Sequence, residues 1–450
     1  MEQQPSFYPE LGKKPVSTGV KLTIKLVTIG ILLIVFLIPK FMIMSLVNER
    51  ADTSEAARET VTDKWAKGQT LRGPILKVPY EVYKEDSKGI AYQELHDCYF
   101  LPKTLAVSGE LAPRELHQSI YQVIVYESKL TISGHFEAPD FGRLKVEPQS
   151  VRWDKAELLL AVADLRGVSD AVSIEWNGKA APFVPDGSDN NLDGSCIAVD
   201  MSDSALQTFP ADFRFALSLK GSERLHFAPV GETTSVSLAS PWNDPQFSAG
   251  YYLPDEREIS ATGFSCKWQI SIYNRNFPQE WTDDKYDIDE RDFGVDLVTV
   301  ADHYQKSLRC VKYSSLIILL IFLAFFLNEA LTAQRVHQFQ YILVGCAIMV
   351  FYVLQLSLSE HTGFNPAYLL STFMTLIMVL LYSRTFLNTW ANSLILTGIL
   401  ALSLGFVFVL LQLENYALLA GSLGLFAVLS ATMFFTRKIR WYETDNGKLQ

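Results

Sequence analysis

A short acidic segment in the middle of the chain partly matches a calcium-binding loop. Asp189, Asn191 and Asp193 place side-chain oxygens at alternate positions, Gly194 takes the sixth place, and Asp200 takes the twelfth. Ca²⁺ binds oxygen ligands around such a turn, but an EF-hand loop carries glutamate at its twelfth place and is flanked by helices. A polar turn between strands explains the segment as well. We therefore assign no metal site and leave calcium binding by this loop as an open alternative.

A second acidic run, DDKYDIDERD, occupies residues 283–292. Charge runs of this kind are usually solvated. We interpret it as a solvated loop, with a cation or partner site as the alternative.

Glu360 and His361 lie side by side between two apolar stretches. A carboxylate beside an imidazole at a membrane boundary could relay protons or form half of a metal site. Neighbours in sequence do not share a helix face, however, and a metal site needs three or four converging ligands. We interpret the pair as helix capping and interface anchoring, and the functional alternative stays open.

Three further polar residues lie within or near the ends of apolar stretches: Asn328, Glu329 and Gln355. Intramembrane ionisable groups are candidates for function. Glu329 is within about one and a half turns of the end of its stretch, close enough to reach water. It is either functional or paired with Arg335.

Motifs for hydrolysis and nucleotide binding are missing from the sequence, including HExxH, GxSxG and the P-loop. The stretch Gly421-Ser422-Leu423-Gly424 is read as a small-residue patch that lets membrane helices approach closely. The sequence predicts a protein that is not an enzyme, with no catalytic residues and no cofactor.

Five cysteines are present, and four of them lie outside the apolar stretches: Cys98, Cys196, Cys266 and Cys310. In an oxidising compartment these four could form two disulfides with three alternative pairings. Buried free thiols are the other interpretation, and the sequence does not decide between them.

The elements that must position these residues are dominated by long apolar stretches. One covers residues 26–47, and five more cover residues 313–333, 339–358, 366–383, 392–411 and 416–435. Each has about the 17–25 residues that an α-helix needs to cross a bilayer, and each is apolar on all sides. We expect six transmembrane helices, an amino-terminal tail at residues 1–25 and a carboxyl-terminal tail at 436–450.

The stretch 26–47 is interpreted as an uncleaved anchor, because it is longer than a signal-peptide core and no small-residue cleavage site follows. Pro39 is expected to kink it, and Lys40 to extend toward the headgroups.

Basic residues assign the sidedness of these helices. Lys13, Lys14, Lys21 and Lys25 precede the first stretch, and Arg335, Arg384, Arg437, Lys438 and Arg440 follow other helix ends. Glu360 and Glu414 occupy the remaining short connections. The positive-inside rule then places both termini in the cytoplasm and residues 48–312 outside.

The long external segment changes its sequence period. Residues 49–66 have a helical composition, and Gly73-Pro74 is expected to end that helix. Beyond it, β-rich runs cover residues 75–83, 121–132, 157–163 and 213–219. Asn177-Gly178 predicts a type I′ hairpin turn. We expect a large antiparallel β-rich domain inserted between the first and second membrane helices.

The formal net charge of -10 and the lack of a basic stripe argue against nucleic-acid binding. The partners expected are the lipid bilayer and, through the external domain, envelope proteins or cell-wall components. The sequence does not indicate the oligomeric state.

The stretch EALTAQRVHQFQYILVG, followed by MVFYVL and SEHTGF, closely resembles the CreD family of bacterial inner membrane proteins. Supporting patches are NERAD at residues 48–52, the segment SPWNDPQF at 240–247, and the tail from Arg437 to Trp441 and Tyr442. The likeness covers roughly residues 25–445, whereas residues 85–235 match only in general character.

The resemblance implies an inner-membrane location and a role in cell envelope integrity and in stress responses, including responses to β-lactams, under a two-component system. It implies no catalytic activity. We expect a non-enzymatic envelope protein whose external domain contacts envelope components or a partner. A transporter or lipid-handling protein is the alternative, and a membrane hydrolase is a weaker third reading.

Overall fold

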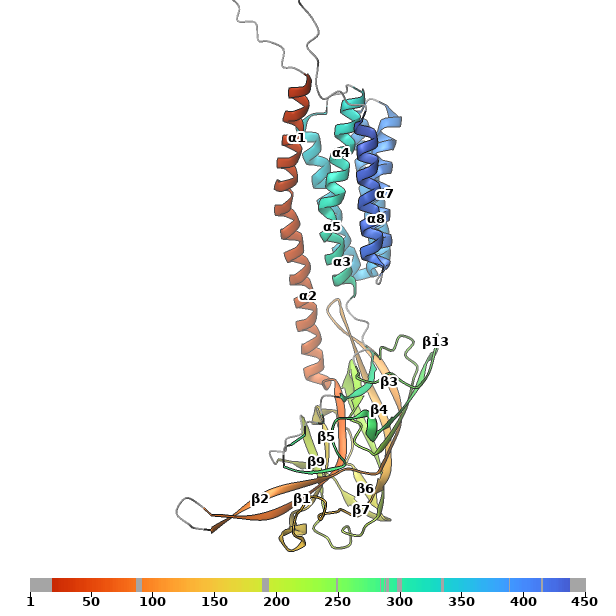
Figure 1. Ribbon diagram of the computed structural model, residues 1–450. Helices are drawn as coiled ribbons and strands as arrows, with labels where there is room; N and C mark the ends of the chain where they lie inside the picture. The colour runs from red at the N-terminus through yellow and green to blue at the C-terminus, as the bar shows by residue number, and fades with distance from the viewer. Residues whose placement is uncertain are drawn as a thin grey trace, which may run out of the picture. The chain divides into compact units, whose positions relative to one another are not determined.

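The computed structural model describes residues 18–85, 91–187, 194–247, 250–283, 285–286, 288, 291–297, 302–332, 336–387, 389–413 and 416–437 (Figure 1). It has two compact units. The helical unit comprises Met1–Thr53 and Ala301–Gln450, and the β-rich unit comprises Ser54–Val300. The domain expected at residues 48–312 is wider than the β-rich unit, because residues 302–312 form a helix that packs within the helical unit.

All six apolar stretches are helical. The helices are α1 (Thr18–Val35), α2 (Leu37–Trp65), α3 (Asp302–Lys312), α4 (Ser314–Thr332), α5 (Gln338–Thr362), α6 (Phe364–Arg384), α7 (Trp390–Gln412) and α8 (Ala417–Thr436). Within the described residues, five helical segments are long and apolar enough to cross a membrane, and the apolar part of α8, Leu418–Phe434, is shorter. The expected multi-pass helical architecture is present, but the count of six spans is not established.

The first apolar stretch is interrupted near the proline expected to kink it. α1 ends at Val35, and α2 begins two residues later with Pro39 in its first turn. Proline has no N–H to donate to the carbonyl four residues earlier, and its ring crowds that carbonyl. The amine of Lys40 donates to the Lys312 carbonyl at 3.1 Å and to Ser315 Oγ at 3.0 Å. Polar atoms where α3 meets α4 therefore bind the Lys40 ammonium group.

Small residues line the helix contacts inside the helical unit. On α6, Ala367, Ser371 and Thr375 are buried at intervals of four residues, so they share one face. α6 packs against both α5 and α7. Small side chains let helix backbones approach closely, which drives association where there is no hydrophobic effect between helices.

The β-rich unit contains two sheets. The first has the order β15-β2-β1-β5-β9-β8, with β11 pairing to β1 and β16 pairing to β11. Its strands are β1 (Gln69–Glu85), β2 (Ala91–Phe100), β5 (Glu157–Val162), β8 (Val184–Asp186), β9 (Ser195–Asp200), β11 (Arg224–Phe227), β15 (Glu280–Thr282) and β16 (Phe293–Asp296).

The second sheet has the order β13-β14-β12-β3-β4-β10-β6-β7. Its strands are β3 (Thr104–Gln118), β4 (Tyr121–Phe136), β6 (Ser173–Trp176), β7 (Lys179–Pro182), β10 (Ala211–Ser222), β12 (Thr233–Ser240), β13 (Glu256–Ser260) and β14 (Gly263–Ser271). Alternate residues of β10 are buried from Ala211 to Leu219, as expected for a strand with one core-facing side.

The expectation of an antiparallel domain is correct for most strand pairs and wrong for two. β1 pairs with β11 in parallel, and β3 pairs with β12 in parallel. Each parallel pair joins strands far apart in the chain, and such crossovers leave no local turn signal in a sequence.

Two turn predictions have different outcomes. Asn177 and Gly178 join β6 to β7 with φ of 49° and 81°, so the hairpin prediction is confirmed. Gly73-Pro74 does not end the helix, because α2 already stops at Trp65. The pair lies inside β1, where the pairing with β5 shifts register between Arg72 and Ile75. Proline cannot donate to the ladder, which accounts for the irregularity.

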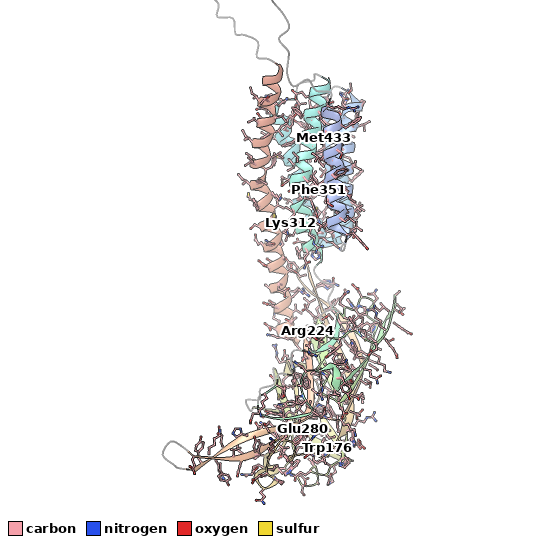
Figure 2. All side chains as sticks on the ribbon, in the orientation of Figure 1. Trp176, Arg224, Glu280, Lys312, Phe351 and Met433 are labelled. Carbon is pink, nitrogen blue, oxygen red and sulfur yellow. The ribbon has the colours of Figure 1, made fainter. Side chains whose placement is uncertain are left out.

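Buried residues of both sheets form one hydrophobic core. Trp176, labelled in Figure 2, is 1% exposed, and its ring lies 5.5 Å from Phe136 and 6.3 Å from Phe213. Aromatic side chains bury large apolar areas and dominate such cores. The β-rich unit therefore has its own core, as an independent domain requires.

Candidate functional site

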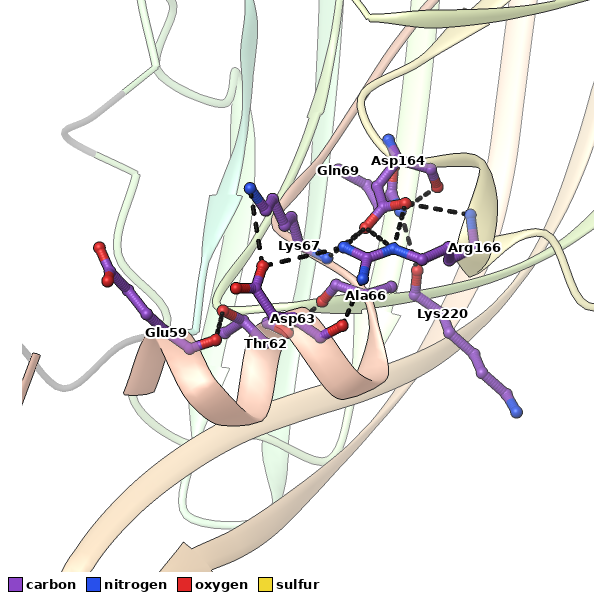
Figure 3. A network of polar contacts seen from close by, with 10 residues as sticks. Glu59, Thr62, Asp63, Ala66, Lys67, Gln69, Asp164, Arg166 and Lys220 are labelled. Carbon is purple, nitrogen blue, oxygen red and sulfur yellow. Dashed lines mark hydrogen bonds and ion pairs between the residues drawn. The ribbon is translucent and has the colours of Figure 1, made fainter. Parts of the chain in front are cut away.

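The carboxyl-terminal end of α2 is fixed within the β-rich unit by a polar network (Figure 3). The last carbonyls of a helix have no partner inside it. Here the Arg166 guanidinium donates to the Asp63 carbonyl, and Ser222 Oγ donates to the Ala66 carbonyl. Both donors come from loops and strands at least 100 residues away in sequence. The helix end is thus capped by the domain that follows it.

Asp164 orients the capping arginine. Its carboxylate accepts from Arg166 Nη2 at 2.7 Å and Nε at 3.0 Å, and from the Lys67 backbone N–H at 3.0 Å. Burial alone raises the pKa of the Asp164 carboxyl. The Arg166 guanidinium and the backbone N–H groups of Lys67 and Arg166 outweigh burial, so this pKa lies below its usual range. The ionised carboxylate of Asp164 is therefore the form that orients Arg166 at the end of α2.

Gln69 joins the loop that carries Asp164 to the two sheets. The side chain is completely buried, at the start of β1. Its amide nitrogen donates to the Asp164 carbonyl at 2.9 Å and to the Lys220 carbonyl at 3.1 Å, and its oxygen accepts from the Asp164 N–H at 3.2 Å. Lys220 in turn places its amine 5.0 Å from the ring centre of Trp65, the last residue of α2. Helix, loop and strand form one hydrogen-bonded unit, which we call the junction.

A charged cleft of about 490 Å³ lies along the last turns of α2. Arg58 Nη2 pairs with the Glu223 carboxylate at 2.6 Å across it, and Glu59, Asp63 and Arg224 are among the lining residues. A cleft lined by both charges can hold a polar ligand, but no group of three or more metal-binding side chains occurs among the described residues.

His226 lies next to this cleft and was not anticipated from the sequence. The imidazole on β11 is 1% exposed. Nδ1 lies 3.3 Å from Asp292 Oδ2, and Nε2 lies 3.3 Å from Asp296 Oδ1. Burial lowers the pKa of His226, but the two carboxylates outweigh burial and raise it to about 8. The imidazolium is therefore the form that these carboxylates favour.

The acidic run at residues 283–292 is only partly the solvated loop we expected. Asp283 Oδ1 lies 2.8 Å from His96 Nδ1, and Asp292 faces buried His226. Ile288 is 3% exposed. These three described residues of the run take part in the packing of the β-rich unit.

The proposed calcium loop lies mostly outside the described residues, which include neither Asp189 nor Asn191 nor Asp193. Asp200 is described and ends β9. Its carboxylate accepts from the Ser202 N–H at 2.8 Å, as in a polar turn.

The ionisable residues of the helical unit do not gather into one site. Glu329 forms an ion pair with Lys25 of α1, and Lys25 also donates to the Val336 carbonyl at 2.9 Å. The alternative partner Arg335 lies outside the described residues. Structural pairing between two helices is the interpretation that the contacts favour for Glu329.

Glu360 and His361 lie in different surroundings. The Glu360 side chain is 9% exposed; it accepts from Tyr304 Oη at 3.2 Å and lies 3.9 Å from Arg50 Nε. His361 is exposed. The contacts of Glu360 favour the interpretation as helix capping and interface anchoring, and a function of the two residues stays a hypothesis.

The side chains of Cys98, Cys196, Cys266 and Cys310 are all buried, and none of these four described residues forms a disulfide. The interpretation as free thiols is confirmed. Burial raises the pKa of Cys98 and of Cys266 to about 12, so these thiols stay protonated and unreactive.

Sequence reasoning missed the junction residues Gln69, Asp164 and Arg166. One local signal was available: Asp164-Leu165-Arg166-Gly167 follows a predicted strand, and Asp164 caps the short turn by accepting from the Arg166 N–H. That signal predicts a turn, but not its contact with a helix about 100 residues earlier.

Comparison with known proteins agrees with the architecture. The family model described as "Inner membrane protein CreD" matches residues 21–442. A protein named "Inner membrane protein CreD" from Escherichia coli (strain K12) is 32% identical over 422 residues, which cover 93% of this chain and 93% of that protein. The resemblance found in the sequence is thereby confirmed, and the chain belongs to the CreD family of inner membrane proteins.

Proposed function

We propose that this inner membrane protein maintains the cell envelope without catalysing a reaction. The β-rich unit lies on the periplasmic side, both termini lie in the cytoplasm, and the β-rich unit contacts an envelope component or a partner protein. Binding there is passed to the membrane helices through α2.

The observation that carries this proposal is the junction at the end of α2. α2 is one helix from Leu37 to Trp65, and its first part belongs to an apolar membrane segment. Its last turn is held by Arg166, Asp164 and Ser222, which belong to the β-rich unit. A helix held at its end by directional, charge-assisted bonds transmits displacement better than a flexible linker does.

The test compares two insertions after Asp52 in cells that lack the chromosomal gene. Gly-Gly-Ser-Gly breaks the helix, whereas a seven-residue alanine-rich insertion adds about two turns and preserves its rotational phase. We expect the flexible insertion to lose resistance to β-lactams and detergents, and the helical insertion to retain most of it. Equal, full resistance from both at matched protein levels would refute transmission through α2.

Sidedness is tested separately with an epitope inserted at residue 188, between β8 and β9. A periplasmic β-rich unit exposes the epitope to antibody on intact spheroplasts. An epitope that becomes accessible only after lysis would overturn the orientation.

Transport or lipid handling is the second candidate, and the buried polar side chains of the helical unit favour it. Such groups in membrane helices often line a path for solutes. Full resistance and unchanged solute uptake in Glu329→Gln and Glu360→Gln variants would count against this candidate.

A further inference from the structure

Two side chains of α5 are completely buried in the helical unit and have polar atoms left over. Gln355 donates from its amide nitrogen to Ser307 Oγ at 3.1 Å. Its other amide end and the hydroxyl of Tyr352 have no hydrogen-bond partner among the described residues. Leaving a buried polar group unpaired is destabilising, and the hydrocarbon around a membrane helix offers no substitute partner.

A third such atom lies at the same depth on α6. The hydroxyl of Ser371 is fully buried and has no partner among the described residues. α5 and α6 form a hairpin around Gly363. Gln355 precedes Gly363 by eight residues and Ser371 follows it by eight. At about 1.5 Å per residue, both stand about 12 Å from the turn.

The short helix α3 brings more polar groups to this level. It packs against α5, α6 and α7, and its residues Ser307 and Cys310 are completely buried one turn apart. Tyr352 lies near both Cys310 and Tyr368, and the Tyr368 hydroxyl donates to the Leu404 carbonyl of α7 at 2.7 Å. The unpaired atoms of Gln355 and Tyr352, one turn apart on α5, therefore lie in the same polar surroundings beside α3, and Ser371 adds a hydroxyl at the same depth on α6.

This region leads toward a polar end of the helical unit. Tyr304 precedes Ser307 by one turn on α3, and Glu360 follows Gln355 by about one and a half turns on α5. Tyr304 Oη donates to Glu360, and Arg50 lies beside the same carboxylate. The polar side chains thus form two neighbouring rows that lead inward. One row on α3 contains Tyr304 and Ser307, and the other on α5 leads from Glu360 through Gln355 to Tyr352.

We infer that α3, α5 and α6 enclose an internal water site, bound by Gln355 and Tyr352 and entered past Glu360. Water fits the chemistry of the region. A buried water makes about three hydrogen bonds to groups that would otherwise stay unpaired, and here an amide end and two hydroxyls are available. A neutral ligand also needs no counter-ion, and none of these three side chains carries a charge.

The inference does not depend on the proposed function, because it concerns hydration of the helical unit and not the role of the β-rich unit. An internal water site gives the transport candidate the inner end of a path for small polar solutes. The test below reads hydration directly and is unaffected by any envelope phenotype.

The experiment is radiolytic hydroxyl-radical labelling of the full-length protein in lipid nanodiscs, read by mass spectrometry. Radicals formed from a bound water oxidise the side chains beside it. Cys310 is the reporter, and Cys346 is its matched control, because it has the same thiol but lies exposed on the outside of α5 among lipid tails. We expect Cys310 to be oxidised several-fold faster than Cys346. Oxidation of Cys310 no faster than that of Cys346 would overturn the proposal.

A variant tests the ligands of the water. Tyr352→Phe combined with Gln355→Leu removes both polar groups at nearly constant volume. The proposal predicts that Cys310 oxidation falls to the rate of Cys346, whereas an unchanged Cys310 rate would contradict the assignment of these ligands. If the double variant does not fold, the comparison of the two thiols in the wild-type protein still decides whether the site is hydrated.

Discussion

The imidazole of His226 and the carboxylate of Asp296 face each other at 3.3 Å on neighbouring strands of the β-rich unit. β11, which carries His226, also pairs with β1, the strand that follows α2. Asp292 approaches the other ring nitrogen. Burial raises the pKa of Asp292, but His226, together with Arg224 and Arg72, outweighs burial and lowers it. A protonated His226 therefore links the first strand of the unit to its last one.

The first prediction concerns pH. Because the pKa of His226 is raised from 6.5 to about 8 in the folded state, its stabilising contribution is fully present below pH 6.5 and is lost as pH rises through about 8. This rise in the pKa of His226 corresponds to about 2 kcal/mol in the free energy of unfolding. Urea titrations followed by tryptophan fluorescence measure it, since six of the eight tryptophans lie in the β-rich unit.

His226→Gln removes the titrating group, so it should flatten stability between pH 6.5 and 8. His117→Gln is the control, because His117 is exposed, and it should leave the pH dependence of the wild type intact. A wild-type protein whose stability is constant across this interval would disprove the role of His226.

The second prediction concerns the junction. Asp164→Ala leaves the Lys67 and Arg166 backbone N–H groups without their carboxylate and frees the Arg166 side chain. Hydrogen bonds to a charged group contribute about 1.5–3 kcal/mol each, so we expect a loss of about 3 kcal/mol in the stability of the β-rich unit. Chemical unfolding at pH 7 measures the loss.

Asp154→Ala is the matched control for this carboxylate. Asp154 also pairs with an arginine two residues away in sequence, but its side chain is 58% exposed. Exposed pairs contribute little to stability, so this variant should unfold close to the wild type. Equal losses for the two variants would mean that burial at the junction has no energetic consequence.

The third prediction concerns the ion pair between Lys25 on α1 and Glu329 on α4. Either single substitution to alanine leaves a charge near the end of a membrane helix without its partner. The double variant removes both charges, so it should be less destabilised than the sum of the single variants, by about 0.5–3 kcal/mol. Thermal unfolding in nanodiscs measures the stability losses of the two single variants and of the double variant. Strict additivity would show that Lys25 and Glu329 do not stabilise each other.

How far the sequence predicted these features depends on the distance between the interacting residues. Helix length and hydropathy predicted the membrane helices, and Asn177-Gly178 predicted a hairpin, because each signal lies within one element. Gln69 meets the Asp164 loop across 95 residues, and Lys25 meets Glu329 across 304. Such contacts depend on how whole elements pack, which local periodicity does not encode.

The parallel pairs of β1 with β11 and of β3 with β12 were missed for the same reason. His226 in isolation is one histidine in a short apolar strand. Only the pairing of β11 with β16 places two carboxylates around it.

The fourth prediction tests the small-residue patch of α8 with two glycines on one helix. A Cβ atom added at Gly424 would lie 2.2 Å from the ring of Phe406 on α7, whereas a Cβ at Gly421 would meet no atom within 4 Å of the described structure. Gly424→Leu should therefore push the Phe406 ring aside or force α8 away from α7, at a cost of about 1–3 kcal/mol. Gly421→Leu should be tolerated, since leucine is a better helix former than glycine and this position faces open space. Thermal unfolding of the two variants in nanodiscs decides the point. Because both substitutions add the same side chain, equal midpoints would mean that the Gly424 contact with Phe406 does not hold α8 against α7.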